Sequence, residues 1–197
     1  MSAAEMPGIA QMLRLTSTDS TQAVARFLAD QGAPDRTLVW ADRQTAGRGR
    51  LQRRWTSRPG GLYFSLILRP DFPPSRLADL SLAAAAAAAE ALAFTGISTA
   101  VKPPNDVIGS LGRRSGKVCG ILAEASGDSR SVDWVVLGVG INVNNAASGI
   151  KGAASLKGLT GRPWEPAEVL HAFLKSFAAA YRRCFEFSGS AAWATRP

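Results

Sequence analysis

The chain has 197 residues, of which 46% are apolar, and its 23 basic and 15 acidic side chains give a formal charge of +8. This length and apolar content are those of one ordinary globular domain, and they exclude a disordered, collagenous or coiled-coil chain. Five of the basic residues are lysines and the rest are arginines, whose forked guanidinium groups suit phosphate and carboxylate. The charge therefore indicates an anionic ligand or a nucleic acid.

Cysteine usage and the N-terminal sequence indicate a reduced, cytoplasmic protein. Cys119 and Cys184 cannot frame a disulfide-stapled domain, and neither lies at a metal-ligand spacing from the single histidine, His171. The first twenty residues lack a basic segment followed by a long apolar one, so no secretory signal is expected. The most apolar stretch, residues 77–94, contains three polar residues and seven consecutive alanines, which favours a buried helix over a membrane span.

Hydrophobic patterning predicts the elements in chain order. A short strand at 9–15 and a helix at 18–29, with Ser20 near its N-cap, come first, and a second strand follows at 37–41. Residues 43–59 are polar, rich in glycine and arginine, and without a period, which predicts a long loop. Loops of this length inside compact domains are usually functional or mobile.

The middle of the chain alternates strands with one long helix. An apolar strand at 62–68 precedes the longest helix, at 75–95, and the next strand, at 98–102, ends at two prolines that cannot donate to a sheet ladder. Strands at 118–124 and 132–143 flank a turn-rich stretch, and we expect them to pair as an antiparallel hairpin.

The last predicted element is an amphipathic helix at 166–185. No internal repeat or break in composition marks a second domain. The order of elements predicts an α+β fold, with a mixed, mainly antiparallel sheet and helices to one side of it.

The strongest chemical signal is Gly-Arg-Gly-Arg at 47–50, inside the predicted loop. Six arginines and no acidic residue lie between Arg43 and Arg58. Gly47 and Gly49 permit close backbone approach to an anion, whose charge the guanidinium groups would neutralise. A phosphate-bearing ligand fits this segment; the alternatives are a solvated basic loop and an arginine-rich RNA-binding segment with Trp55 stacked on a base.

Three further segments bring polar groups or glycines to strands. Residues 101–106 end a strand at a rigid Pro-Pro turn and present a lysine, an asparagine and an aspartate side by side, a pattern that ordinary turns also show. Lys117 opens a strand interrupted by Gly120, which indicates close approach of a ligand, and in residues 137–143 two glycines again interrupt a strand. No helix follows the last segment, so it is not a dinucleotide-binding fingerprint.

In this order the segments resemble the catalytic domain of biotin protein ligases, over residues 18–144. The matching patterns are Asp-Ser-Thr at 19–21, Gly-Arg-Gly-Arg at 47–50 with Trp55, Pro-Asn-Asp at 104–106, Lys-Val-Cys-Gly-Ile-Leu-x-Glu at 117–124 and Gly-Val-Gly-Ile-Asn at 138–142. The resemblance implies a domain like that of class II aminoacyl-tRNA synthetases. It also implies formation of biotinyl-5′-AMP from biotin and Mg²⁺-ATP, then transfer of biotin to a lysine of a biotin carboxyl carrier domain.

The resemblance also implies roles for individual residues. Lys117 would reach the reacting carboxylate and α-phosphate, Asp106 would orient or deprotonate the carrier lysine, and Arg48 would contact carboxylate and phosphate from a closing loop. The residues implied in biotin binding are Ser20, Thr21, Gln44, Gly47, Arg48, Tyr63, Ser65, Lys117, Gly120, Ile121 and Gly138. Those implied in binding ATP or the adenylate are Arg48, Gly49, Arg50, Arg53, Trp55, Asn105, Lys117 and Asn142, and no metal ligands are assigned.

The chain departs from the family's usual pattern at three positions. Pro103 stands where the family has tryptophan, Gln22 where asparagine usually follows the Ser-Thr pair, and Gln52 where a glycine commonly follows the arginine-glycine segment. We expect the catalytic domain to occupy residues 1–187 and a tail residues 188–197, without the family's small C-terminal β-barrel or an N-terminal DNA-binding domain.

Three other functions remain open at this point. They are a lipoate or octanoyl ligase, which shares the fold, a catalytically lapsed binder of biotin or nucleotide, and an RNA-binding module. The intact motifs at 47–50 and 117–124 favour biotin. The expected partner is then a biotin carboxyl carrier protein, with no DNA or membrane partner and a homodimer compatible with the family.

Overall fold

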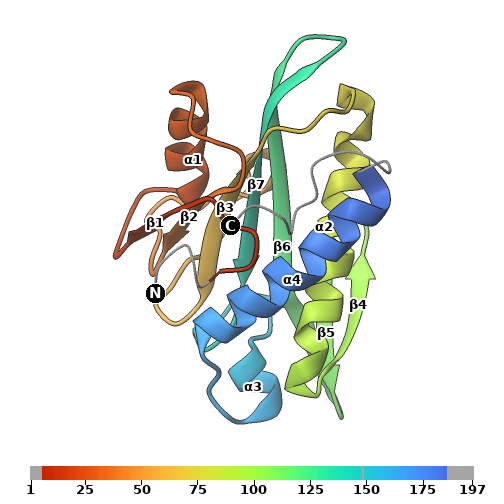
Figure 1. Ribbon diagram of the computed structural model, residues 1–197. Helices are drawn as coiled ribbons and strands as arrows, with labels where there is room; N and C mark the ends of the chain where they lie inside the picture. Colours follow the sequence, from red (N-terminus) through yellow and green to blue (C-terminus); the bar gives the residue numbers. More distant parts are fainter. Residues whose placement is uncertain (1–5, 148, 186–197) are drawn as a thin grey trace.

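The computed structural model describes residues 6–147 and 149–185. Within these residues seven strands form one sheet in the order β1-β2-β3-β7-β6-β5-β4 (Figure 1). β1 and β2 run parallel and every other neighbouring pair is antiparallel. The strands are β1 (Gln11–Leu15), β2 (Thr37–Ala41), β3 (Leu62–Leu68), β4 (Ser98–Lys102), β5 (Asp106–Leu111), β6 (Arg114–Gly127) and β7 (Val132–Ile141). The α+β prediction with a mixed, mainly antiparallel sheet is confirmed.

Helices cover both faces of the sheet. The α-helices are α1 (Thr21–Asp30), α2 (Leu77–Leu92), α3 (Leu156–Thr160) and α4 (Pro166–Phe185), and the 3₁₀ turns are η2 (Arg50–Gln52), η3 (Pro74–Arg76) and η4 (Ala93–Thr95). Phe64 and Leu137 belong to the core cluster that includes residues of α2 and α4, whereas Ile67 and Val136 cluster with residues of α1. The expectation of helices on one side alone is wrong, because β3 and β7 are apolar on both faces.

Element bounds follow the prolines and glycines of the sequence closely. The strands predicted at 37–41, 62–68 and 98–102, the helix at 166–185 and the hairpin of β6 with β7 are all confirmed. The predicted long helix is divided into η3, α2 and η4, and it ends at Gly96, whose φ of 81° few other residues adopt. The predicted domain end at 187 and the tail at 188–197 lie outside the described residues.

By length and composition, the described residues contain one helix that could cross a membrane, Pro74–Thr95. In the fold, α2 packs against α4 and the sheet, and Leu80, Ala84 and Leu92 are fully buried. This is the environment of a core helix, which passes the same test of length and composition.

Arg69, the residue after β3, ties the C-terminal end of α1 to the sheet. Its guanidinium donates to the carbonyl oxygens of Ala29 (2.9 Å) and Ala33 (2.8 and 3.0 Å), and its backbone N–H donates to the Asp35 carboxylate (2.9 Å). The last carbonyls of a helix lack partners within it. We therefore expect Arg69→Ala to lower the free energy of unfolding by about 2 kcal/mol, measured by urea denaturation followed by circular dichroism.

The matched control is Arg130→Ala in the turn between β6 and β7. There the backbone N–H of Arg130, not its side chain, donates to Asp128 at 2.7 Å. This substitution is expected to change the free energy of unfolding by less than about 0.5 kcal/mol. Equal losses in the two variants would contradict the role given to the Arg69 guanidinium.

Candidate functional site

The sheet has a hollow on the face that carries α1, where neighbouring strands lack side chains. Gly120 of β6 pairs with Gly140 of β7, and Gly138 pairs with Leu122 on one side and with Ser65 of β3 on the other. Paired residues, and residues two apart in one strand, lie on the same face of a sheet. A cavity of about 390 Å³ lies over these positions, which is the size of a small-molecule site.

The ring of Trp55 packs against the bare backbone at two of these glycines. A Cβ atom on Gly140 would lie 2.6 Å from Trp55 Cε2 and Nε1, and one on Gly120 would lie 2.8 Å from Trp55 Cζ3. Lys117 Nζ lies 5.1 Å from the centre of the indole ring, within the range of a cation–π interaction. The glycines therefore make room for an aromatic ring that reaches the site from the long loop.

A chain of hydrogen bonds closes the end of the cavity beside α1. Gln44 Oε1 accepts from the Thr21 N–H (2.8 Å) and from Thr21 Oγ1 (3.1 Å), and Gln44 Nε2 donates to Ser57 Oγ (2.7 Å). Ser65 Oγ lies 3.0 Å from both Thr21 Oγ1 and Gln22 Oε1. Because the Thr21 hydroxyl proton is directed at Gln44, the Thr21 oxygen can still accept a hydrogen bond.

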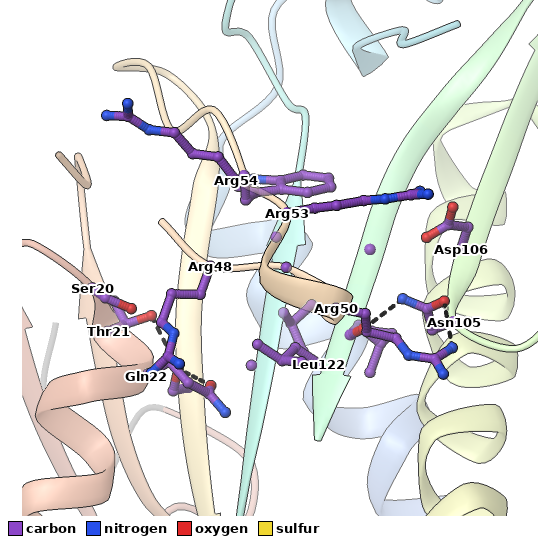
Figure 2. A pocket seen from close by; sticks show the side chains of 18 of the residues that line it. Ser20, Thr21, Gln22, Arg48, Arg50, Arg53, Arg54, Asn105, Asp106 and Leu122 are labelled. Carbon is purple, nitrogen blue, oxygen red and sulfur yellow. Dashed lines mark hydrogen bonds between the residues drawn. The ribbon is translucent and has the colours of Figure 1, made fainter. Parts of the chain in front are cut away.

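The hydroxyl of Ser20 is available to a ligand. Ser20 lines the cavity, and its Oγ is buried without a hydrogen-bond partner among the described residues. Burying a hydroxyl without a hydrogen bond costs free energy. Ser20, Thr21 and Gln22 lie together on one side of the cavity (Figure 2). This end of the cavity therefore suits a ligand that carries both donors and acceptors.

Charged groups occupy the opposite wall of the cavity (Figure 2). Lys117 Nζ lies 2.6 Å from Asp106 Oδ1, and both side chains are partly buried. Arg50 Nη1 donates to Asn105 Oδ1 (3.3 Å), while Asn105 Nδ2 donates to the carbonyl of Ile121 (2.8 Å). The cavity thus joins a neutral polar end to a cationic end.

The loop at 43–59 contributes arginines to the cationic end and contains an unusual backbone segment. Leu51 and Gln52 have φ of 53° and 59°, in the left-handed region that favours glycine. Gln52 stands at the position where the family commonly has glycine. Such residues cost about 1 kcal/mol or more each, and they cluster at ligand clamps.

A second cavity of about 310 Å³ adjoins the first, with Trp55 and Lys117 in the wall of both. Asn142 and Lys151 line the second cavity and not the first. Asn142 Nδ2 donates to the Lys117 carbonyl (3.3 Å), so it also supports the strand position of that lysine. Because the two cavities share Lys117, each can hold one of two reactants with its reactive group close to that lysine.

Most of the predicted site residues lie together. Those that line the first cavity are Ser20, Thr21, Gln44, Arg48, Gly49, Arg50, Arg53, Trp55, Ser65, Asn105, Asp106, Lys117, Gly120, Ile121 and Gly138. Asn142 lines the second cavity. Gly47 does not line the first cavity; it packs within the loop, where a Cβ atom would meet Trp55 O at 2.6 Å.

The structure corrects the prediction that Tyr63 forms a wall of the cavity. Its side chain is fully buried, its hydroxyl donates to the carbonyl of Arg58 (2.7 Å), and its burial raises its pKa. The ring lies close to Gly61, which has no side chain to exclude it. Tyr63 therefore anchors the end of the loop.

Sequence reasoning did not assign Gly140, Gln22 or Arg54 to the cavity, although all three line it. Gly140 had a usable signal, because its spacing of two from Gly138 places both glycines on one face of a strand. Arg54 had none beyond its place in the basic loop.

The buried thiol of Cys119 is unsuited to nucleophilic chemistry, and the described residues contain no metal cluster. Burial raises the pKa of the Cys119 thiol to about 12, so it is neutral at physiological pH and a poor nucleophile. Within residues 6–147 and 149–185, no three His, Cys, Asp or Glu side chains gather as ligands for a metal ion.

The fold and site define an α+β domain whose cavity joins a polar end to a loop suited to anions. The sequence model of the biotin/lipoate A/B protein ligase family matches residues 14–142, and the chain belongs to this family.

Individual relatives agree with this assignment. The chain is 41% identical over 170 residues to a bifunctional ligase/repressor BirA of Bacillus spizizenii, covering 83% of this chain and 51% of that protein. It is 37% identical over 173 residues to a biotin–[acetyl-CoA-carboxylase] ligase of Paracoccus denitrificans, covering 83% and 70%. The chain therefore spans about half the length of the BirA relatives that it matches.

A solved structure supports the same fold. The biotin protein ligase from Aquifex aeolicus in complex with biotin and ATP superposes with a TM-score of 0.75 at 36% sequence identity, covering 91% of this chain and 74% of that one.

Proposed function

We propose that the chain is the catalytic domain of a biotin protein ligase. The observation that carries the proposal is the first cavity, which has the unpaired hydroxyl of Ser20 beside the Thr21 and Gln44 side chains at one end and Lys117 with Arg50 at the other. The ureido ring of biotin has N–H donors and a carbonyl acceptor, which hydroxyl and amide groups can satisfy. The apolar tail of lipoate or octanoate would leave these buried groups unpaired, which disfavours that alternative.

In the first half-reaction, a biotin carboxylate oxygen attacks the α-phosphorus of ATP and pyrophosphate leaves. Lys117, Arg48 and Arg50 would neutralise the charge that develops on the phosphoryl oxygens. Mg²⁺ would enter with ATP as part of the substrate, coordinated by its phosphates. The two cavities that share Lys117 would hold biotin and the nucleotide on either side of the reacting atoms.

In the second half-reaction, the amine of a carrier lysine attacks the carbonyl carbon of biotinyl-5′-AMP and AMP leaves. The lysine must first lose a proton, and the Asp106 carboxylate lies in the cavity beside Lys117 to accept it. Closure of the loop over the mixed anhydride would exclude water and limit hydrolysis.

The proposed partner is a biotin carboxyl carrier protein, in keeping with the name of the Paracoccus denitrificans relative. The net charge of +8 would attract an acidic carrier domain. A cytoplasmic location, a homodimer and the lack of a membrane or DNA partner stay predictions. The Bacillus relatives are named as repressors as well as ligases.

The decisive experiment is biotin-dependent exchange of labelled pyrophosphate into ATP. We expect exchange with biotin and none with lipoate or octanoate. Tight biotin binding without exchange would favour the lapsed binder, and exchange supported by octanoate or lipoate alone would favour the other ligase. RNA binding that is sensitive to salt and indifferent to biotin would favour the RNA-binding module.

A further inference from the structure

Glu124 belongs to the matched motif, yet the proposed mechanism does not use it. It lies on β6 two residues beyond Leu122, so both side chains project from the face of the sheet that forms the cavity. Its Oε1 atom lies 3.7 Å from Arg48 Nη2 and 3.8 Å from Arg26 Nη1. One carboxylate therefore connects the long loop, helix α1 and β6.

At this point the loop is held mainly by its own backbone hydrogen bonds, such as that from the Gly49 N–H to the Arg53 carbonyl (2.7 Å), and by the contact of Arg50 with Asn105. Residues 46–54 line a hollow of about 620 Å³ together with Leu122 and Glu124, so the loop does not pack tightly on β6 there. Among the arginines of the loop, Arg48 is the one whose ion pair with an acidic side chain is seen in the described residues. A loop with two consecutive residues in the left-handed region keeps that conformation only when its surroundings hold it.

The environment of Glu124 suits a contact that forms and breaks. Its Oε2 atom is buried without a hydrogen-bond partner among the described residues, so the two arginines are the counter-charges that offset its burial. Arg48 is 48% exposed, and ion pairs at such positions are weak. Arg48 also keeps donors free, because a guanidinium has five N–H groups.

We propose that Glu124 is a positioning residue that holds Arg48 in the wall of the cavity and thereby slows the escape of an acyl-adenylate. Figure 2 shows Arg48 reaching toward the side where Thr21 and Gln22 lie, opposite Arg50 and Asn105. Held there, Arg48 lines the cavity and keeps its positive charge where a bound ligand would contact it. This inference rests on the proposed function, because the ligand is biotinyl-5′-AMP.

The first test measures how firmly the loop is held and does not depend on enzyme activity. Trypsin cleaves after arginine, so the rate of cleavage between residues 48 and 54 of the folded protein, followed by mass spectrometry, reports how firmly the loop is held. Glu124→Gln keeps the shape of the side chain and removes its charge, and we expect cleavage about fivefold faster than in the wild type. The control Glu90→Gln, at an exposed position of α2, should leave the rate unchanged.

The second test measures release of preloaded biotinyl-5′-AMP. We expect Glu124→Gln to release it about fivefold faster, and to have no further effect in an Arg48→Ala background. Arg26→Gln should release it at the wild-type rate, because that substitution breaks the pair to α1 and spares the pair to the loop.

Three results would overturn the proposal: unchanged cleavage and release in Glu124→Gln, the same increase in the Arg48→Ala background, or an equal increase in Arg26→Gln. If the wild type neither binds biotinyl-5′-AMP nor exchanges pyrophosphate, the proposed function fails. The trypsin comparison then still decides whether Glu124 holds the loop.

Discussion

Lys117→Ala is expected to lower the rate of biotin-dependent pyrophosphate exchange by about 100-fold or more. Lys117 lies in the wall shared by the two cavities, 2.6 Å from Asp106 and 5.1 Å from the centre of the Trp55 ring. In the proposed mechanism its charge would stand where negative charge grows as the carboxylate attacks phosphorus. The neutral polar end of the cavity is formed by other residues, so biotin binding should weaken far less than the exchange rate.

The same substitution should slow the second half-reaction when biotinyl-5′-AMP is supplied directly. The leaving AMP carries the same phosphoryl oxygens, so the lysine would act on both steps of the proposed mechanism. Pyrophosphate exchange, and single-turnover transfer to a carrier domain, measure the two steps separately. Lys175→Ala on the exposed face of α4 is the matched control, since it removes a lysine far from both cavities. A normal rate in either half-reaction would remove the role given to Lys117 there.

Local sequence signals were sufficient for much of the fold. The strands at 37–41, 62–68 and 98–102 are short apolar or β-branched runs next to proline, glycine or polar segments, so their ends are marked in the chain. β5 escaped prediction because it follows Pro-Pro-Asn and contains Gly109. That glycine is required by packing, since a Cβ atom there would lie 2.9 Å from Val118 and 3.0 Å from Ile97.

The site was predictable where its residues share a motif and unpredictable where distant segments meet. Gly138 and Gly120 interrupt strands, and that signal is local. By contrast, the burial of Tyr63 beneath the end of the loop depends on how residues 58–61 fold back over β3. The pairing of Glu124 with Arg48 likewise joins a strand to a loop far away in the sequence, and no spacing rule encodes it.

Two glycines of β7, Gly138 and Gly140, are expected to respond differently to substitution by alanine, the first through biotin binding and the second through ATP binding. A Cβ atom on Gly138 would collide with Gln22 Oε1, which is held by Ser65 and by a bond from Gln22 Nε2 to the Val136 carbonyl (3.0 Å). Gly138→Ala must therefore displace the polar end of the cavity. We expect the dissociation constant for biotin to rise about 100-fold, measured by isothermal titration calorimetry.

Gly140→Ala should instead weaken the binding of the nucleotide. Its new Cβ atom would lie 2.6 Å from the Trp55 ring, which must move away from the wall shared with the second cavity. We expect the KM for ATP to rise by at least tenfold, about 1.4 kcal/mol, while biotin affinity falls much less than in Gly138→Ala. Gly158→Ala in α3 is the matched control, because its nearest contact is Ser155 Oγ at 3.2 Å and it lines neither cavity.

Thermal unfolding of all three glycine variants separates these effects from a general loss of fold. If Gly138→Ala binds biotin as the wild type does, the head group cannot lie beside Gln22, and the polar end of the cavity must serve another ligand. If Gly140→Ala weakens biotin and ATP equally, Trp55 does not divide the site. The unequal pattern is expected because Gln22 and Trp55 cover different glycines of the same strand, so each substitution disturbs one of the two and leaves the other in place.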